Sequence, residues 1–328
     1  MLGRAKSETT LVADAPLVSV IVPAYNAVST LTSTLASVAA QDYPNFEVII
    51  VDDGSKDTTA AMAQDFAARD PRFRVVNKAN GGVAAARNTG IEQSKGEFIA
   101  TLDADDLWRP NKLSAQVAAF LEGGDKVGVV YTWYLLIDPS DRPLRTVTPK
   151  HSGDVMRAIC TANIFGNGST PMFRRSALLE AGCYDPGLRA AKAEGCEDWK
   201  LYSRIASRYE ARVIKQFLTY YRMHPHSMSS DVMQMMRSHE IVSAELLRDF
   251  PQYRNALRRH AINLLMGLLL RTMSVGDWRQ SRVLLGMMLA RYPSFAIFML
   301  LAYPAKCVIR SFQRLDGLEQ APPVGQRA

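Results

Sequence analysis

Short β-branched apolar runs alternate with longer amphipathic segments through the N-terminal part of the chain. The apolar runs predict buried strands, and the segments whose apolar residues recur at helical spacing predict helices. Strands that alternate with helices predict right-handed crossovers and a mainly parallel sheet flanked by helices, which is an α/β fold. The predicted strands are residues 18–22, 46–51, 73–76, 98–102 and 127–137, and the predicted helices are residues 31–38, 58–69, 83–94 and 110–121.

Polar residues follow each of the first four predicted strands. Ligands of open α/β sheets bind beyond the carboxyl ends of the strands, so we expect these four segments to meet at one edge of the sheet. The G-x-G-x-x-G pattern of dinucleotide-binding proteins is absent after the first strand, which argues against a dehydrogenase. The polar segments are residues 23–26, 52–57, 77–82 and 103–106.

Three carboxylates, Asp103, Asp105 and Asp106, crowd the exit of the fourth strand. Carboxylates this close repel one another and need a cation or solvent between them. An oxygen-rich cluster suits a hard divalent ion such as Mg²⁺ or Mn²⁺. The alternative is a polar loop in which an Asp caps the following helix.

The other polar segments carry groups that suit a nucleotide. Asp52 and Asp53 can accept hydrogen bonds from a base and a ribose, or they can open a turn and cap the next helix. Lys78 and Arg87 are suited to phosphate or to pairing with the acids, and a solvated surface position is the alternative for each. Gly82, in a Gly-Gly pair before a helix, permits close approach of the backbone to a ligand, or is simply part of a loop.

The middle of the chain is less regular. Residues 138–143 predict a turn between two strands, residues 171–175 an edge strand, and residues 176–181 a short helix. Asp198 lies in the first turn of another predicted helix, where capping by an acid is as good an explanation as catalysis. His224 is either a surface histidine or a group that reaches the metal or the phosphates.

Composition adds limits on partners. The 328 residues are 48% hydrophobic and carry a net charge of +7, which suggests an anionic partner such as nucleic acid, an acidic membrane surface or a phosphorylated substrate. The four cysteines form no C-x-x-C pair, so neither a disulfide framework nor a zinc site is indicated, and a cytoplasmic setting is expected.

The C-terminal third predicts further helices, including residues 260–273 and 280–291. The apolar run at residues 295–303 falls short of the ~20 residues that cross a bilayer. With its flanking basic residues it is expected to lie in an anionic membrane interface, or else to pack on the catalytic domain or a second subunit. The expected organisation is a disordered lead-in (1–15), a catalytic domain (16–230), a C-terminal helical region (231–318) and a disordered tail (319–328).

Over roughly residues 16–229 the chain resembles a family 2 inverting glycosyltransferase with the Rossmann-like GT-A fold. Each matching motif is modest alone, but their order and spacing together are specific. The motifs are residues 20–26, 51–55, 80–88, 102–106, 197–199 and 221–224.

The resemblance implies a nucleotide-diphosphate sugar donor, with uracil as the expected base. Asp105 and His224 match ligands of a Mn²⁺ or Mg²⁺ ion, and Asp198 matches the general base. Lys200 departs from the family pattern, which often has an acid there. The implied donor-binding residues are Pro23, Tyr25, Asn26, Asp52, Asp53, Lys78, Gly82, Arg87, Asp103 and Ala104.

The expected activity is transfer of a sugar to a hydroxyl of a glycan or lipid-linked acceptor at the inner face of the cell membrane, as in cell-surface polysaccharide synthesis. Oligomerisation is left open. A nucleotidyltransferase also needs acidic metal ligands on an α/β sheet and is one alternative. A non-catalytic membrane-binding protein is another. A basic nucleic-acid-binding protein is a third, although the expected rim is acidic rather than positive.

Overall fold

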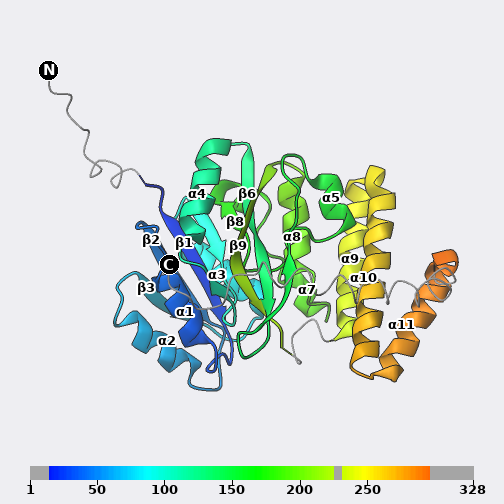
Figure 1. Cartoon of the computed structure of the whole chain (residues 1–328), viewed down its shortest axis with the longest axis horizontal. Coiled ribbons are helices and arrows are strands. Elements are labelled where there is room, and N and C mark those ends of the chain that lie inside the picture. Colours follow the sequence, from blue (N-terminus) through cyan, green and yellow to red (C-terminus); the bar gives the residue numbers. More distant parts are fainter. Residues whose placement is uncertain (1–14, 225–230, 296–328) are drawn as a thin grey trace.

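The computed structural model describes residues 15–224 and 231–295 (Figure 1). The expected lead-in at residues 1–15, except Ala15, and the tail at 319–328 lie outside the described residues. The apolar segment at 295–303, except Phe295, also lies outside them.

The N-terminal half has the predicted alternation of strands and helices. Its four strands pair in parallel in the order β3-β2-β1-β4, with helices in the connections between them (Figure 1). The mainly parallel α/β sheet expected from the apolar runs is therefore confirmed. The elements are β1 (Val18–Ala24), α1 (Leu31–Ala39), β2 (Phe46–Asp52), α2 (Thr59–Ala67), β3 (Phe73–Asn77), α3 (Val83–Gln93) and β4 (Phe98–Thr101).

The second half of the sheet adds antiparallel strands, in the order β4-β8-β6-β9-β5, with β7 paired to β6. The edge position predicted for residues 171–175 is wrong, because β8 pairs with β4 on one side and β6 on the other. Both Met172 and Phe173 are completely buried. The elements are β5 (Leu107–Trp108), α4 (Lys112–Gly123), β6 (Val127–Ile137), β7 (Pro143–Val147), β8 (Met172–Arg174) and β9 (Glu210–Arg222).

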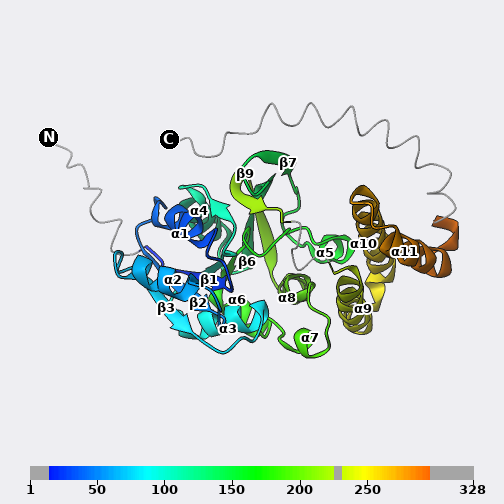
Figure 2. The same cartoon turned by 90° about the horizontal axis from the view of Figure 1, so that it is seen from below.

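Both faces of the sheet are covered, as the uninterrupted apolar strands require. Side chains of β1 alternate between two apolar clusters, with Val20 in the cluster that includes α1 and α4 and Ile21 in the cluster that includes α3 and α8. Helix α3 approaches β1 so closely that a Cβ on Gly90 would lie 2.3 Å from Ile21. Figure 2, seen from below, shows α1 and α4 on one side of β1 and α3 on the other.

Helices α9, α10 and α11 lie beside the sheet and form the C-terminal part, whereas α5 to α8 belong to the middle of the chain (Figure 1). Val242 and Leu246 of α9 and Leu257 of α10 belong to the same apolar cluster as α8. No helix within residues 15–224 and 231–295 has the length and apolar character needed to cross a bilayer. The helices are α5 (Met156–Thr161), α6 (Arg175–Glu180), α7 (Gly187–Ala190), α8 (Glu197–Ala206), α9 (Val232–Asp249), α10 (Arg254–Ser274) and α11 (Trp278–Arg291).

One buried cation leads to a prediction about stability. Lys112 is completely buried, with its ammonium 2.7 Å from Gln116 Oε1 and 4.0 Å from the Trp108 ring centre. Burial lowers the pKa of Lys112 well below its usual range. Between the lowered pKa of the folded chain and about 10.4, the ordinary lysine pKa, the unfolded chain binds more protons than the folded chain, so stability rises with pH in that range.

We expect Lys112→Met to unfold at a higher urea concentration than the wild type at neutral pH. This stability advantage should shrink as pH rises towards about 10.4, where the lysine loses its proton in the unfolded chain as well. Burying the amine then no longer costs the wild type a proton, whereas the variant never had this cost. Urea denaturation across that pH range measures the difference. An advantage that does not change with pH would show that the Lys112 amine keeps its proton in the folded protein.

Candidate active site

The polar segments that follow β1, β2 and β3 meet at one edge of the sheet. Ala24, Asp52 and Asn77 lie level with one another in the register of the three strands. The loop after β4 joins this edge, because the Thr34 hydroxyl of α1 lies 3.0 Å from the Ala104 carbonyl oxygen. The expected convergence of the strand ends is therefore present.

Asp53 uses its carboxylate to hold the loop that follows β3. Its Oδ1 accepts from the Lys78 ammonium at 2.7 Å and from the Gly81 N–H at 2.9 Å, and its Oδ2 accepts from the Gly82 N–H at 2.7 Å. Gly82 takes a φ of 86°, where a side chain would be strained. Asp53 thus orders the glycine loop, and Lys78 is tied to that loop.

Asp52 is different, because one of its oxygens is left over. Its Oδ2 accepts from the Ser55 N–H at 3.2 Å, but its Oδ1 is buried without a hydrogen-bond partner. A buried acceptor without a partner is costly unless a ligand or water supplies a donor. Of the two adjacent carboxylates, Asp52 is therefore the one with an oxygen available to a base N–H.

The residues at the end of β1 and just after it contact the loop after β2. The Asn26 N–H donates to Ser55 Oγ at 3.0 Å, and Asn26 Oδ1 accepts from the Lys56 N–H at 2.8 Å. Tyr25 is 46% exposed. Pro23 is buried as a member of β1, one residue before the strand end. Asn26 therefore joins the loops after β1 and β2, and both Tyr25 and Asn26 are open to solvent.

The third acid of the loop after β4 has a structural role. Asp106 is completely buried, and its carboxylate accepts from Ser169 Oγ at 2.5 Å and from the Arg222 N–H at 2.8 Å. Arg222 also donates from Nε to the Asp105 carbonyl oxygen at 2.8 Å. These contacts hold the acidic loop after β4 against Ser169 and against Arg222 of β9. Ser169 and Arg222 were not predicted as site residues, although Arg222 lies within the matching motif at residues 221–224.

Arg87 joins the acidic loop to α8. It is 3% exposed, and its two terminal nitrogens donate at 2.6 Å to Asp103 Oδ1 and at 2.6 Å to Asp198 Oδ1. Gly168 lies against this bridge, where a Cβ would come within 2.1 Å of the guanidinium. Residues of α3, of the loop after β4 and of α8, far apart in the sequence, thus form one ion-pair network.

The network affects the basicity of Asp198. Burial raises the pKa of Asp198, the Arg87 guanidinium lowers it, and the charge on Asp103 raises it again, with a net rise. A raised pKa makes a carboxylate a better proton acceptor while it stays ionised near neutral pH. Asp198 therefore has the chemistry expected of a general base.

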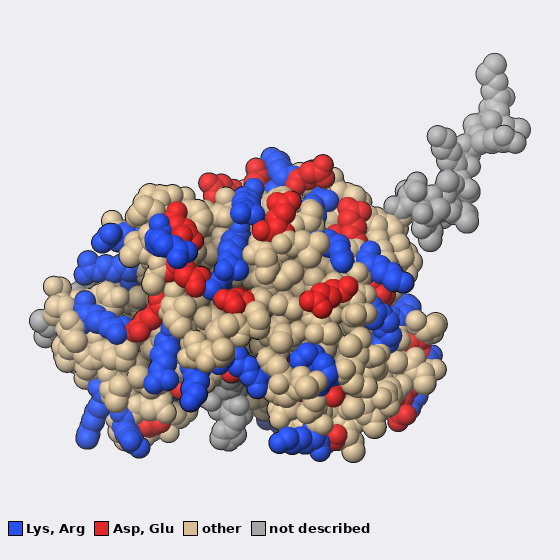
Figure 3. Space-filling model, turned by 180° about the vertical axis from the view of Figure 1, so that it is seen from behind, with Lys and Arg blue, Asp and Glu red and all other residues tan. Residues whose placement is uncertain are grey.

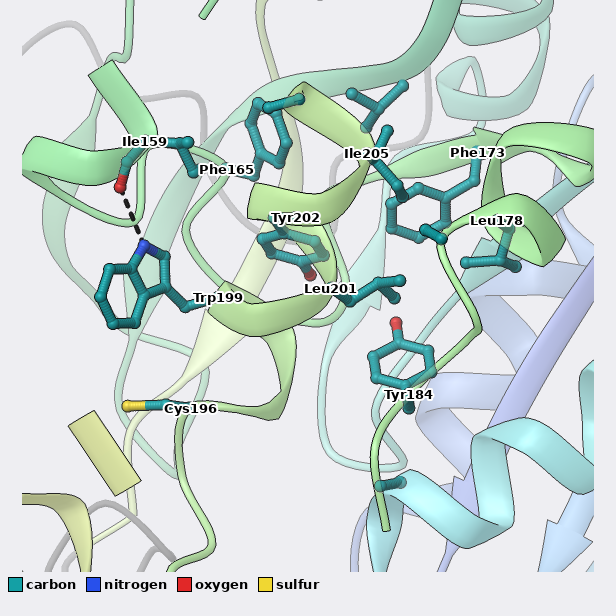
Figure 4. Packing of buried hydrophobic residues seen from close by; sticks show 14 of the residues in the cluster. Ile159, Phe165, Phe173, Leu178, Tyr184, Cys196, Trp199, Leu201, Tyr202 and Ile205 are labelled. Carbon is teal, nitrogen blue, oxygen red and sulfur yellow. Dashed lines mark hydrogen bonds between the residues drawn. The ribbon is translucent and has the colours of Figure 1, made fainter. Parts of the chain in front are cut away.

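Helix α8, which carries Asp198, is held in place by contacts with α5, α9 and α10. The Trp199 indole donates to the Ile159 carbonyl oxygen at 2.8 Å, and its ring stacks on His239 of α9 and meets the edge of His260 of α10 (Figure 4 shows the Trp199–Ile159 bond). Lys200 is 5% exposed and pairs with Asp185 at 2.7 Å and with Glu245 of α9 at 2.6 Å. Lys200, the departure from the family pattern, therefore joins α8 to the C-terminal helices.

Asp105 and His224 are the residues that could hold a metal. His224 Nε2 lies 3.1 Å from Asp105 Oδ2, and both side chains are about one third exposed, at 32% and 36%. Burial and then the charge on Asp103 raise the pKa of Asp105 to about 6, because both disfavour the ionised carboxylate. A cation bound to this carboxylate would stabilise its ionised form. One carboxylate and one imidazole suit Mg²⁺ or Mn²⁺ when substrate phosphates complete the shell. No larger cluster of metal-binding side chains occurs among the described residues.

The sheet order and the acidic loop after its fourth strand define a GT-A-like α/β fold, and comparison with known proteins agrees. The Glycosyl transferase family 2 profile matches residues 19–182, which is half of the chain. The chain therefore belongs to glycosyl transferase family 2, as the motifs suggested.

The relatives are similar over part of their length. The Escherichia coli UDP-Glc:alpha-D-GlcNAc-diphosphoundecaprenol beta-1,3-glucosyltransferase WfgD is 36% identical over 135 residues, which is 41% of this chain and 52% of WfgD. The matches to uncharacterized glycosyltransferases from Rickettsia typhi and Rickettsia felis cover 41% and 22% of those two proteins, respectively. The chain thus spans less than two thirds of the length of these curated relatives.

Two solved structures share the fold. S. aureus TarS 1–349 in complex with UDP-GlcNAc has a TM-score of 0.62 at 20% identity, over 85% of this chain and 82% of that TarS 1–349 chain. The mannosyltransferase PcManGT from Pyrobaculum calidifontis, in complex with GDP-Man and Mn²⁺, has a TM-score of 0.60 at 20% identity, over 94% of this chain and 85% of PcManGT.

Proposed function

We propose that this protein is a metal-dependent inverting glycosyltransferase that moves a sugar from a UDP-sugar to a hydroxyl of a glycan or lipid-linked acceptor. The observation that carries the proposal is the network in which Arg87 joins Asp103, at the strand ends, to Asp198 on α8. It brings a carboxylate with a raised pKa to the edge of the sheet where a nucleotide sugar is expected to bind.

The donor would lie across the strand ends. Asp52 Oδ1, buried without a partner, would accept from the base, with Pro23, Tyr25 and Asn26 beside the nucleotide. The loop of Lys78 and Gly82 would face the ribose and phosphates. Support for a UDP-sugar comes from TarS, which binds UDP-GlcNAc, and from WfgD, whose name gives UDP-Glc as donor and a GlcNAc-diphosphoundecaprenol acceptor.

Transfer would be a single displacement. Asp198 takes the proton of the acceptor hydroxyl, and the hydroxyl oxygen attacks the anomeric carbon from the face opposite the leaving diphosphate. Arg87 keeps the Asp198 carboxylate oriented and donates to Asp103 with its other terminal nitrogen. Asp103, with Ala104 next to it in the chain, would contact the ribose and the sugar. A divalent ion held by Asp105 and His224 would offset the charge that grows on the diphosphate.

A donor screen tests the activity. Purified protein with Mn²⁺ or Mg²⁺ and a set of nucleotide sugars is expected to release nucleoside diphosphate when an acceptor hydroxyl is present. Release of pyrophosphate instead would identify a nucleotidyltransferase. Retention on DNA without any turnover of sugar nucleotides would favour the nucleic-acid-binding alternative.

Asp105→Ala is expected to weaken Mn²⁺ binding in the presence of UDP. The loss of affinity should be at least as large as the about 10–100-fold loss caused by replacing a residue that only supports a metal ligand. His224→Ala should weaken it in the same direction, because it removes the second protein ligand. Electron paramagnetic resonance of Mn²⁺ with UDP and protein measures this without any turnover.

His151→Ala is the matched control, since His151 is an exposed histidine outside the candidate site, and the Tyr131 hydroxyl donates to its backbone carbonyl oxygen rather than to its side chain. It should bind Mn²⁺ as the wild type does. Equal Mn²⁺ affinity for Asp105→Ala and the wild type would remove Asp105 from the role of ligand.

A further inference from the structure

Exposed apolar side chains gather around the turn between α10 and α11. Among the described residues, eleven large hydrophobic side chains are exposed, and five of them lie between Met273 and Leu289. At the turn itself, Val275 is 74% exposed, Trp278 60% and Met273 40%, while Val283 and Leu289 continue the exposed set along α11. A concentration of this kind marks an interaction surface rather than scattered exposure.

The turn is well ordered, so the exposure does not come from a frayed helix end. Asp277 caps α11 by accepting from the Gln280 N–H at 3.0 Å, and the Ser281 hydroxyl donates to Thr272 Oγ1 at 2.9 Å across the hairpin. Trp278 is thus held outward at the first position of α11, whereas Trp108 and Trp199 are almost fully buried.

The charge around the turn has one sign. Within the ranges of α10 and α11 there are seven arginines and no acidic residue, and Asp277, between the helices, is engaged as the α11 cap. Arg279 and Arg282 are exposed and stand one and four residues after Trp278. Figure 3 shows Lys and Arg side chains over the C-terminal helical part of the molecule. This surface is complementary to an anionic partner and not to a basic one.

The turn between α10 and α11 lies on the same side of the molecule as the carboxyl end of β1. In Figure 1 the turn between α10 and α11 lies at the lower edge of the molecule, and β1 runs towards that same edge with its carboxyl end. The strand ends that form the candidate active site therefore open on the side of the molecule where the turn projects.

We propose that the α10–α11 turn docks on an anionic membrane surface, with Trp278, Val275 and Met273 entering the interface and Arg279 and Arg282 facing lipid phosphates. Tryptophan prefers the boundary between acyl chains and head groups, and each arginine near an anionic leaflet adds about 1 kcal/mol. The docking itself does not depend on the proposed transfer reaction. If that reaction uses a lipid-linked acceptor, docking brings the active-site edge towards the membrane.

The test compares two matched double variants of the full chain. Trp278→Ser/Arg279→Glu removes one exposed apolar side chain and reverses one exposed arginine at the turn. Leu121→Ser/Arg69→Glu makes the same two changes on the catalytic domain, where Leu121 is 63% exposed and Arg69 is exposed. Both variants keep residues 296–328 unchanged, so any lipid binding by that segment is common to them.

Flotation with vesicles of phosphatidylcholine alone or mixed with phosphatidylglycerol gives the readout. The wild type and the Leu121→Ser/Arg69→Glu variant are expected to bind only the anionic vesicles, with weaker binding as salt is raised. The turn variant should bind at least about tenfold more weakly, because reversing one arginine removes about two charges' worth of attraction.

Trp278 fluorescence adds a second readout, since its emission should shift to the blue on anionic vesicles. Equal vesicle binding by the two double variants would overturn the proposal, as would equal binding of the wild type to neutral and anionic vesicles. A wild-type dimer that the turn variant loses, without vesicle binding, would instead assign the surface to a second copy of the chain. Transfer of the sugar to a soluble acceptor, measured without vesicles as release of nucleoside diphosphate, separately tests the transfer reaction.

Discussion

Asp198→Asn is expected to lower the rate of sugar transfer by about 10²–10⁴-fold, the usual contribution of a general base, while binding of the nucleotide sugar is retained. Asn cannot take the acceptor proton, but its Oδ1 can still accept from Arg87, so the site should keep its shape. Initial rates of nucleoside diphosphate release measure the first effect. Calorimetric titration with the donor measures the second.

Asp65→Asn is a suitable control, because Asp65 is an exposed residue of α2 and the change removes the same single charge. It should leave the transfer rate unchanged. Thermal unfolding separates loss of catalysis from loss of fold. Full turnover by Asp198→Asn would show that another group takes the proton, and the mechanism proposed above would have to be replaced.

Arg87→Met is expected to destabilise the protein by about 3 kcal/mol, at the lower end of the cost of breaking a buried ion pair. The guanidinium is nearly fully buried, and its removal leaves Asp103 and Asp198 without their shared partner. Their side chains keep 27% and 22% exposure, which limits the cost. Urea unfolding at neutral pH measures the change.

Two comparisons make this expectation specific. Arg87→Met/Asp198→Asn should be more stable than Arg87→Met alone, because one of the two unpaired charges is gone. Arg72→Met, which breaks a more exposed pair with Asp70, should cost under about 1 kcal/mol. If the double variant is no more stable than Arg87→Met, repulsion between the two carboxylates is not the source of the loss.

Arg87→Met should also change the pH dependence of sugar transfer. Arg87 is the group that lowers the pKa of Asp198 against burial, so its removal raises that pKa further. Asp198 acts as a base only when ionised, and activity is lost as pH falls through its pKa. The acidic limb of the rate profile in Arg87→Met is therefore expected at higher pH than in the wild type, and in Arg87→Lys between the two.

The sequence predicted the N-terminal half of the fold well, for a local reason. The strands β1 and β2 are apolar runs rich in β-branched residues and almost entirely buried, and the helices that follow them have apolar residues at helical spacing, so each element is encoded within its own segment. The same alternation predicts that the segments after the strands share one edge of the sheet. That prediction includes Asp52, Asp103 and Asp105 among the residues at this edge.

The antiparallel part of the sheet was predicted less well. β8 has only three residues, and its place between β4 and β6 depends on pairing with strands far away in the sequence. A short apolar segment carries no information on which side its partners lie, so an edge strand was expected. β9 was not predicted as a strand, because its irregular pairing with β6 is not visible as a simple alternation.

By itself, the sequence determined the α/β class, the family motifs and the types of chemical group present at the site, because these follow from local pattern and residue type. Only the tertiary structure decided how the charged groups are shared. It assigned Asp53 to the glycine loop, left Asp52 Oδ1 without a partner, and placed Arg87 between Asp103 and Asp198. Pairing among buried charges depends on distances between elements far apart in the chain, and no local pattern encodes those distances.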